Sequence, residues 1–176
     1  MNVQNLIIDL ISQSAANVFS TMLGAELGPP EASIEQGVPE VNDGIVSFIG
    51  LAGAWAGTGS VVCSPTVACR ICSLMLMTDT TSVDADVLDA VAELTNMIVG
   101  SVKNDLEPHL GTLGLSIPTV VFGKNFRTKS AGATDWIVVR FPWEGDVLVV
   151  KLFLAPTERV PHAVSHMMGQ TCPLEV

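Results

Sequence analysis

Hydrophobic side chains in the segment Asp84 to Leu106 (DADVLDAVAELTNMIVGSVKNDL) recur at the spacing of an amphipathic helix. At about 100° per residue, one stripe of this helix is apolar and comprises Val87, Val91, Leu94, Ile98 and Val102. The opposite stripe, called the polar stripe below, comprises Asp89, Glu93, Asn96, Gly100 and Asn104. We therefore predict a helix that packs its apolar stripe on a core and presents the polar stripe to solvent.

The polar stripe offers a carboxylate and a carboxamide one helical turn apart. Glu93 and Asn96 stand on the same face, so both side chains can touch the same object. Gly100 follows on this stripe, where a larger side chain would hold a partner away. Because glycine inside a helix costs about 1 kcal/mol relative to alanine, its presence needs a reason. A solvated helix face without a function is the alternative that the spacing alone leaves open.

Periodicity and end signals predict two further helices, at Leu6–Leu23 and Ser64–Met77. The second of them begins with Ser-Pro, which suits an N-cap serine followed by proline at the first helical position. For the helix that carries the polar stripe, the expected N-cap is Ser82 or Asp84. Its expected end is Glu107-Pro108, with Gly111 just beyond.

Alternation and turn residues predict a sheet built mainly from two hairpins. Their strands are Ile45–Ala52 with Gly59–Cys63, joined by a turn around 53–57, and Trp136–Phe141 with Val147–Leu154. Leu115–Phe122 is a further strand, and Pro118 marks it as an edge strand. An extended segment leads to Pro39, and the residues from Gly123 to Asp135 are predicted to form a polar loop.

The order of these elements indicates an internal duplication, with copies at about 6–77 and 84–155. Asn17 and Pro39 have the same separation as Asn96 and Pro118. At this offset the first copy lacks both acids of the polar stripe, so we expect a complete site in the second copy alone. The whole chain, 1–176, is expected to form one domain, with 156–176 as a C-terminal tail.

Composition supports a folded protein and excludes several function classes. Of the 176 residues, 48% are hydrophobic and 15% charged, which argues against disorder. The formal net charge of −10 disfavours nucleic acid and anionic lipid surfaces as partners. No apolar run approaches the roughly 20 residues of a membrane span, and Asp9 interrupts any signal-peptide pattern. We therefore expect a cytoplasmic protein.

Cysteines and histidines offer a second candidate chemistry. Cys69 and Cys72 form a CxxC motif, which fits a redox pair or half of a zinc site. However, the surrounding segment is apolar and a second CxxC is absent, so we interpret these cysteines as buried reduced thiols. His162 and His166 have a spacing that suits a metal on a helix, but the tail around them has little periodicity. We expect no metal or cofactor bound by this chain itself.

The order Asp89, Glu93, Asn96 and, further along, Pro118 resembles the signature of the CheC/CheX/FliY family of chemotaxis phosphatases. The resemblance follows the element order of nearly the whole chain and is sharpest from Asp84 to Phe126. One full motif, in the second half, resembles the CheX branch. The implied fold is α/β (α+β): a pseudo-symmetric sandwich with an antiparallel or mixed sheet of two hairpins plus edge strands, packed with three helices. A homodimer is also implied.

The resemblance implies a hydrolase that removes phosphate from the aspartyl phosphate of a CheY-like response regulator. Asn96 would position the attacking water, because a carboxamide both accepts and donates hydrogen bonds. Glu93 would dock to a lysine of the partner. Asp89 either extends the contact or sits near the helix start, where the helix dipole favours an acid. Gly100 and Asn104 complete the partner-binding face. Mg²⁺, where required, would be held by the response regulator.

Two other functions remain open. A non-catalytic module of the same fold would recognise a response regulator or a flagellar motor component through the same face, without needing the Asn96 amide. A redox protein would instead need reactive, accessible thiols at Cys69 and Cys72. Unpaired sheet edges make a homodimer plausible in either case, although the sequence does not single out a strand.

Overall fold

The computed structural model of the chain describes residues 3–36, 40–128 and 135–157. Its α-helices are α1 (Val3–Val18), α2 (Pro65–Leu76) and α3 (Ala85–Leu110), and α1 continues as a π-helical segment, η1 (Phe19–Leu23). Its strands are β1 (Glu31–Gln36), β2 (Glu40–Gly53), β3 (Trp55–Cys63), β4 (Leu113–Leu115), β5 (Thr119–Thr128), β6 (Asp135–Trp143) and β7 (Asp146–Pro156).

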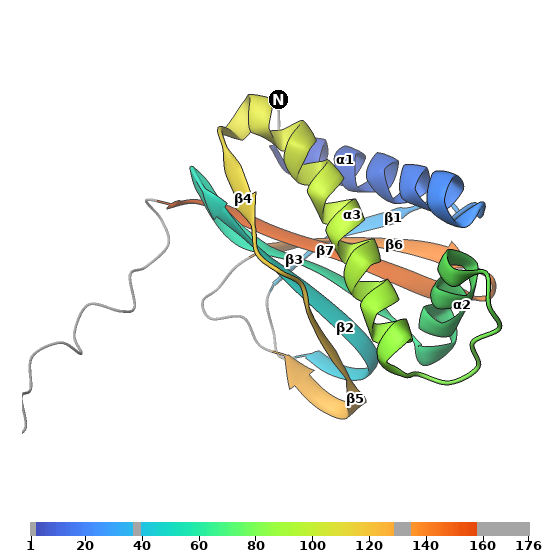
Figure 1. The fold of residues 1–176 in the computed structure, drawn as a ribbon. Helices are drawn as coiled ribbons and strands as arrows, with labels where there is room; N and C mark the ends of the chain where they lie inside the picture. The colour runs from blue at the N-terminus through green and yellow to red at the C-terminus, as the bar shows by residue number, and fades with distance from the viewer. Residues whose placement is uncertain (1–2, 37–39, 129–134, 158–176) are drawn as a thin grey trace, which may run out of the picture.

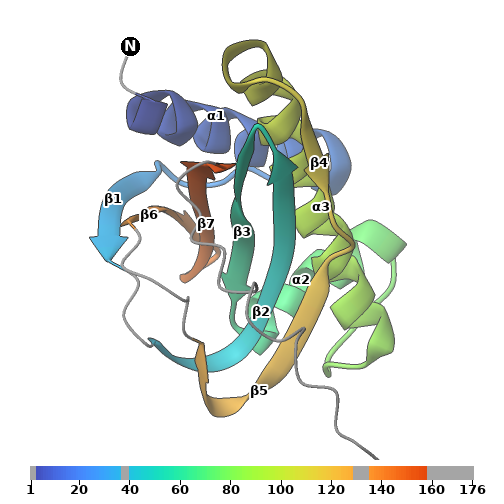
Figure 2. The same ribbon diagram turned by 90° about the vertical axis from the view of Figure 1, so that its left-hand side faces the viewer.

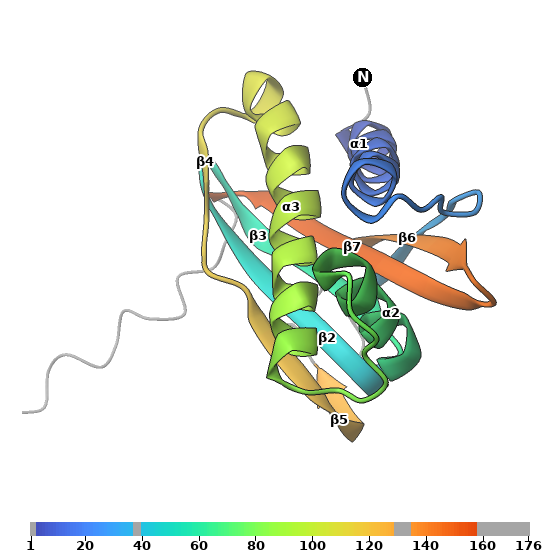
Figure 3. The ribbon, with the colours of Figure 1, turned by 45° about the vertical axis from the view of Figure 1, so that its right-hand side comes forward.

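The strands form one sheet, and the helices lie on one of its faces. The strand order is β1-β6-β7-β3-β2-β4, and β5 also pairs with β2. Every pairing is antiparallel. All three α-helices of the described chain cover the same side of the sheet, and α3 runs across β2 and β3 (Figures 1 and 3). The predicted mixed α and β fold with an antiparallel sheet and three helices is confirmed.

The sheet brings the two predicted hairpins side by side. β3 of the first hairpin pairs with β7 of the second. The outer strands are exchanged between the halves, because β1 pairs with β6 and β5 pairs with β2 (Figure 2). The β6–β7 turn contains Glu144 and Gly145, both with positive φ, as a two-residue hairpin turn requires. The internal duplication stays a prediction.

The apolar stripe predicted for α3 forms the centre of the core. Its members have at most 1% of their surface exposed: Val87, Val91, Leu94, Ile98 and Val102. Gly59 of β3 lets this helix approach closely, because a Cβ there would lie 2.8 Å from both methyl groups of Val99. Helix α1 packs alongside and is tied to α3 by Ser14, whose Oγ donates to the carbonyl of Ile98 at 3.1 Å. The helix that carries the polar stripe is therefore rigidly seated.

The first helix contradicts the prediction that no apolar run approaches the length of a membrane span. Val3–Leu23 is long and apolar enough to cross a membrane by length and composition. In the fold, however, one face of it is buried in the core through residues such as Ile11, Ala15 and Phe19. Its apolar character is thus explained by packing on the sheet and against α3, as in the core helix of a soluble protein.

Of the predicted signals for the end of the third helix, Gly111 is confirmed as the C-cap, whereas Glu107-Pro108 does not end it, because α3 continues to Leu110 with Pro108 inside it. Proline removes only one hydrogen bond in a last turn, where the helix is ending anyway. Gly111 then ends the helix with a φ of 85°, and its N–H donates to the carbonyl of Glu107 at 3.0 Å. The Glu107 side chain also accepts from the N–H of Leu113 at 2.9 Å, which fixes the turn into β4.

Three strand predictions need correction. The segment from Gly123 onward is not a loop, because β5 extends to Thr128 by pairing with the early part of β2. The predicted strand Leu115–Phe122 is interrupted after Leu115 and resumes at Thr119. The first hairpin turn is tighter than the predicted 53–57, since Ala54 alone separates β2 from β3. The edge position of the strand after Pro118 is confirmed, because β5 pairs with β2 alone among the described strands.

Candidate functional site

Helix α3 begins immediately before the polar stripe and is well capped. Asp84 is the N-cap, and its Oδ1 accepts a hydrogen bond from the N–H of Val87 at 3.0 Å. This arrangement satisfies one of the free N–H groups of the first turn. Of the two predicted caps, Ser82 and Asp84, the structure has Asp84. A fixed start means that the rotation of every later residue about the helix axis is also fixed.

The polar stripe lies on the side of α3 that faces away from the core. Asp89, Glu93, Asn96 and Asn104 are exposed, and Gly100 is half-buried. Within the described part of the chain, the side chains of Glu93 and Asn96 make no hydrogen bond or ion pair. The stripe extends about 22 Å along the helix at 1.5 Å per residue. A carboxylate and a carboxamide therefore face solvent together on a rigid support.

Gly100 is not required by the packing of the chain itself. A Cβ at this position would meet Leu115 Cδ1 at 3.6 Å, which is an ordinary van der Waals contact. In contrast, a Cβ at Gly59 would overlap with Val99. The helix thus carries a residue that weakens it without an internal steric reason, and an external reason, room for a partner, remains.

The C-terminal end of the stripe is engaged in contacts of its own. Lys103 Nζ lies 2.8 Å from Glu107 Oε1 and donates to Asn104 Oδ1 at 3.4 Å. The hydrogen bond from Lys103 to Glu107 and the one from the Leu113 N–H lower the pKa of Glu107. The Asn104 carboxamide therefore has a neighbour within the helix, whereas Glu93 and Asn96 do not. The role of Asn104 in partner binding stays a prediction.

The signature proline, Pro118, follows a short irregular segment between β4 and β5. Ser116 anchors this segment to β2, because its N–H donates to the Gly50 carbonyl at 2.9 Å and its Oγ accepts from the Gly50 N–H at 2.8 Å. Ile117, which lies between Ser116 and Pro118 in the sequence, is 87% exposed. Sequence reasoning missed Ile117, because an isoleucine within a predicted strand gives no sign that it faces water.

The cysteines do not form a reactive site in the described residues. Cys63, Cys69 and Cys72 are free and buried. Burial raises the pKa of Cys63 to about 12 and also raises the pKa of Cys69. The interpretation as buried reduced thiols is confirmed for these three, while Cys172, His162 and His166 lie outside the described residues. No group of three or more metal-ligating side chains occurs in the described ranges.

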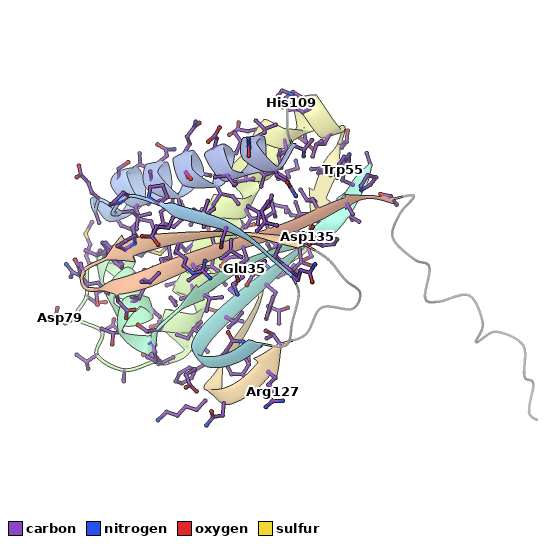
Figure 4. All side chains as sticks on the ribbon, turned by 180° about the vertical axis from the view of Figure 1, so that it is seen from behind. Glu35, Trp55, Asp79, His109, Arg127 and Asp135 are labelled. Atoms are coloured by element: carbon purple, nitrogen blue, oxygen red, sulfur yellow. The ribbon has the colours of Figure 1, made fainter. Side chains whose placement is uncertain are left out.

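The ends of α3 carry no further candidate residue. His109 is exposed in the last turn, and Asp79 lies in the connection that leads to the first turn (Figure 4). The pair Glu93 and Asn96 is therefore the candidate site that the fold supports. The fold thus presents an acid and an amide to solvent on a long helix that is seated on an antiparallel sheet of two hairpins.

Comparison with known proteins identifies the family. The family described as Chemotaxis phosphatase CheX matches residues 45–142. This chain belongs to the CheX family of chemotaxis phosphatases. No sequence among curated proteins matches the chain.

Solved structures give the same fold. A CheC-like superfamily protein from Shewanella sp. PV-4 is 28% identical, with a TM-score of 0.74 over 88% of this chain and 99% of that one. CheX from Vibrio vulnificus is 25% identical, with a TM-score of 0.74 over 85% and 99% of the two chains. The CheX–CheY–BeF3–Mg²⁺ complex from Borrelia burgdorferi contains a chain with 22% identity and a TM-score of 0.66, over 84% and 97%.

Proposed function

We propose that this protein hydrolyses the aspartyl phosphate of a CheY-like receiver domain. The observation that carries the proposal is the Asn96 carboxamide, exposed and without a described partner, one turn from an equally exposed Glu93. Membership of the CheX family supports a phosphatase, and the Borrelia complex supports a CheY-like partner. The acidic surface of the stripe also suits a partner that presents a cationic group beside its phosphoryl group.

Asn96 would act by positioning water. Its carboxamide oxygen accepts a hydrogen bond from the attacking water, and its NH2 group donates to an acceptor that fixes its orientation. The water oxygen forms a bond to phosphorus while the bond from phosphorus to the aspartyl oxygen breaks. The aspartate leaves as a carboxylate, and the water proton passes to the phosphate product. Such catalysis is mainly alignment, since an acyl phosphate needs no strong base.

Glu93 would fix the register of the two proteins. Its carboxylate forms a charge-assisted bond with a lysine of the receiver domain, which places Asn96 on the side of the phosphorus opposite the leaving carboxylate. Asp89 adds negative charge one turn earlier. It either extends this contact or interacts favourably with the helix dipole. Mg²⁺ would be supplied by the acidic pocket of the receiver domain and would neutralise phosphoryl charge there.

A non-catalytic adaptor is the second candidate. It would use the same exposed face to recognise a receiver domain or a flagellar motor component without hydrolysis. The free Asn96 amide favours the phosphatase, because docking alone does not need it. We also propose a cytoplasmic homodimer, because open sheet edges must be covered or paired. The burial of Cys69 and Cys72 disfavours the redox alternative.

The test follows the decay of a phosphorylated CheY-like receiver domain with wild-type protein and with Asn96→Ala. Asn17→Ala is the matched control, since Asn17 is an exposed asparagine on α1 and is the counterpart of Asn96 in the predicted repeat. We expect Asn96→Ala to reduce the acceleration about 100-fold, the scale of a lost alignment, while binding persists. Asn17→Ala should behave as wild type.

Two outcomes would change this conclusion. Binding without any acceleration by the wild type would make the protein an adaptor. Equal losses in the Asn96 and Asn17 variants would show that the assay reports a general defect and not the alignment of water at α3.

A further inference from the structure

One strongly exposed apolar side chain lies near the candidate site. Ile117 is 87% exposed, more than any other large hydrophobic residue of the described chain except Met77. It stands between β4 and β5, on the segment that ends at Pro118. An isolated exposed isoleucine needs no explanation in itself. What makes Ile117 informative is where the chain holds it and how firmly.

Two contacts align this segment with α3. At one end, Leu115 lies beside Gly100 of the polar stripe, with Cδ1 3.6 Å from the position of a Cβ there. At the other end, Phe122 lines the same hollow as Val83, just before α3 begins. The segment therefore runs antiparallel to the helix, and Figure 3 shows β4 and β5 passing along its side.

The helical stretch and the extended segment beside it have similar lengths, so each residue of the segment can be matched to a level along the helix. From Val83 to Gly100 the chain rises about 25 Å along the helix. From Leu115 to Phe122 the extended chain covers about 23 Å. Proportional spacing puts the backbone of Ile117 and the following Pro118 beside the turn of α3 that carries Glu93 and Asn96. The exposed apolar residue and the polar pair therefore lie at the same level along α3.

The backbone at Ile117 is fixed from both sides. The preceding residue, Ser116, exchanges two hydrogen bonds with Gly50 of β2, and its Oγ also donates to the Ile117 carbonyl at 3.0 Å. The following residue, Pro118, restricts Ile117 itself to an extended conformation. An apolar side chain held in water by a rigid backbone loses little backbone freedom on binding, which favours affinity. This is also a physical reason for a proline at this point of the signature.

We infer that Ile117 is an apolar anchor for the same receiver domain that α3 engages, and that Pro118 serves to present it. This inference rests on the proposed function and adds a second, hydrophobic half to the docking surface. A second copy of this chain is a poor occupant, because a two-fold contact here would bring two acidic stripes together. An anionic membrane is disfavoured by the same charge, because Asp86, Asp89 and Glu93 are exposed on α3.

The test measures the dissociation constant for a beryllofluoride-activated CheY-like receiver domain, together with KM and kcat for its phosphorylated form. The variants are Ile117→Ser, the conservative Ile117→Val, and Ile34→Ser. Ile34 is the matched control, because it is an isoleucine 48% exposed on β1, at the opposite edge of the sheet. Since Ile117 is almost fully exposed, replacing it leaves folding unchanged.

We expect Ile117→Ser to raise both the dissociation constant and KM about 10-fold or more, the effect of losing a buried isoleucine, with kcat unchanged. Ile117→Val should restore most of the affinity, and Ile34→Ser should match wild type. The loss should be the same at low and high salt, whereas the effect of Glu93→Gln should shrink as salt screens the charge.

Different failures have different meanings. Affinity unchanged by Ile117→Ser, in a protein whose wild type binds and dephosphorylates the receiver, overturns the anchor and leaves the proposed function intact. A wild type that neither binds nor accelerates overturns both. Binding without acceleration overturns the phosphatase, and the dissociation constants still decide whether Ile117 is an anchor.

Discussion

Replacing Gly100 by alanine should make the protein more stable and less active. Alanine in a helix interior is favoured over glycine by about 1 kcal/mol, mainly because glycine has more backbone freedom to lose. The new methyl group would meet Leu115 Cδ1 at 3.6 Å, so no steric penalty offsets this gain. For a chain of this size, such a change raises the melting temperature by about 2–4 °C.

The same methyl group would stand out from the polar stripe, next to the turn that carries Asn96. It would separate the helix from a docked receiver domain at a point where the stripe is otherwise flat. We expect the rate of receiver dephosphorylation at subsaturating substrate to fall about 10-fold, equivalent to about 1.4 kcal/mol of lost transition-state stabilisation. The two assays are thermal or urea unfolding and the decay of a phosphorylated receiver domain.

Gly59→Ala is the control for the steric reasoning. Its Cβ would lie 2.8 Å from the methyl groups of Val99, so this variant should be destabilised. If Gly100→Ala is stabilised and keeps full activity, Gly100 is outside the docking surface. If Gly100→Ala is destabilised, the account of its surroundings is wrong. Opposite shifts in stability and activity are the result that the structure predicts.

Two further predictions concern charge and thiols. Hydrogen bonds from Ser33 and Arg140 lower the pKa of Glu35 below its ordinary value of 4.5. The ionised Glu35 therefore contributes to stability above pH 4.5, and this contribution is lost as the pH falls through the lowered pKa of the folded protein. Glu35→Gln should therefore weaken the dependence of unfolding free energy on pH below about 4.5, measured by urea titrations in acid. In a Cys172→Ser variant, the remaining cysteines are Cys63, Cys69 and Cys72, which are buried. The native variant at pH 8 should react with a thiol reagent far more slowly than the unfolded variant. Fast labelling of the native protein would contradict the burial of these cysteines.

Elements defined by local pattern were predicted well from the sequence. The apolar stripe of α3 repeats at the helical period, so periodicity alone identified its buried side and, by exclusion, the face of Glu93 and Asn96. The two hairpins followed for the same reason, since alternation and turn residues are close in the chain. The chemistry proposed for that face came from resemblance, and the geometry supports it through exposure and free hydrogen-bonding groups.

What the sequence could not supply depends on distant partners. The segment after Gly123 is polar and reads as a loop, yet it is a strand because β2 extends far enough to pair with it. Pro108 reads as the end of a helix, yet α3 continues for two more residues to Leu110, and the Glu107 side chain fixes the exit into β4 through its bond to Leu113. The segment before Ile117 is likewise held by hydrogen bonds between Ser116 and Gly50, residues far apart in sequence.

In the proposed function, stability and partner recognition depend on different sides of helix α3. The buried side is fixed by contacts with the sheet and with α1, including the bond from Ser14 to the Ile98 carbonyl. On the exposed side, the side chains of Glu93 and Asn96 make no hydrogen bond or ion pair within the described chain. Under the proposed function, substitutions at neighbouring stripe positions, such as Asp89, should change which receiver domain binds and leave folding intact. A library randomised at Asp89 and Ile117 would test this consequence.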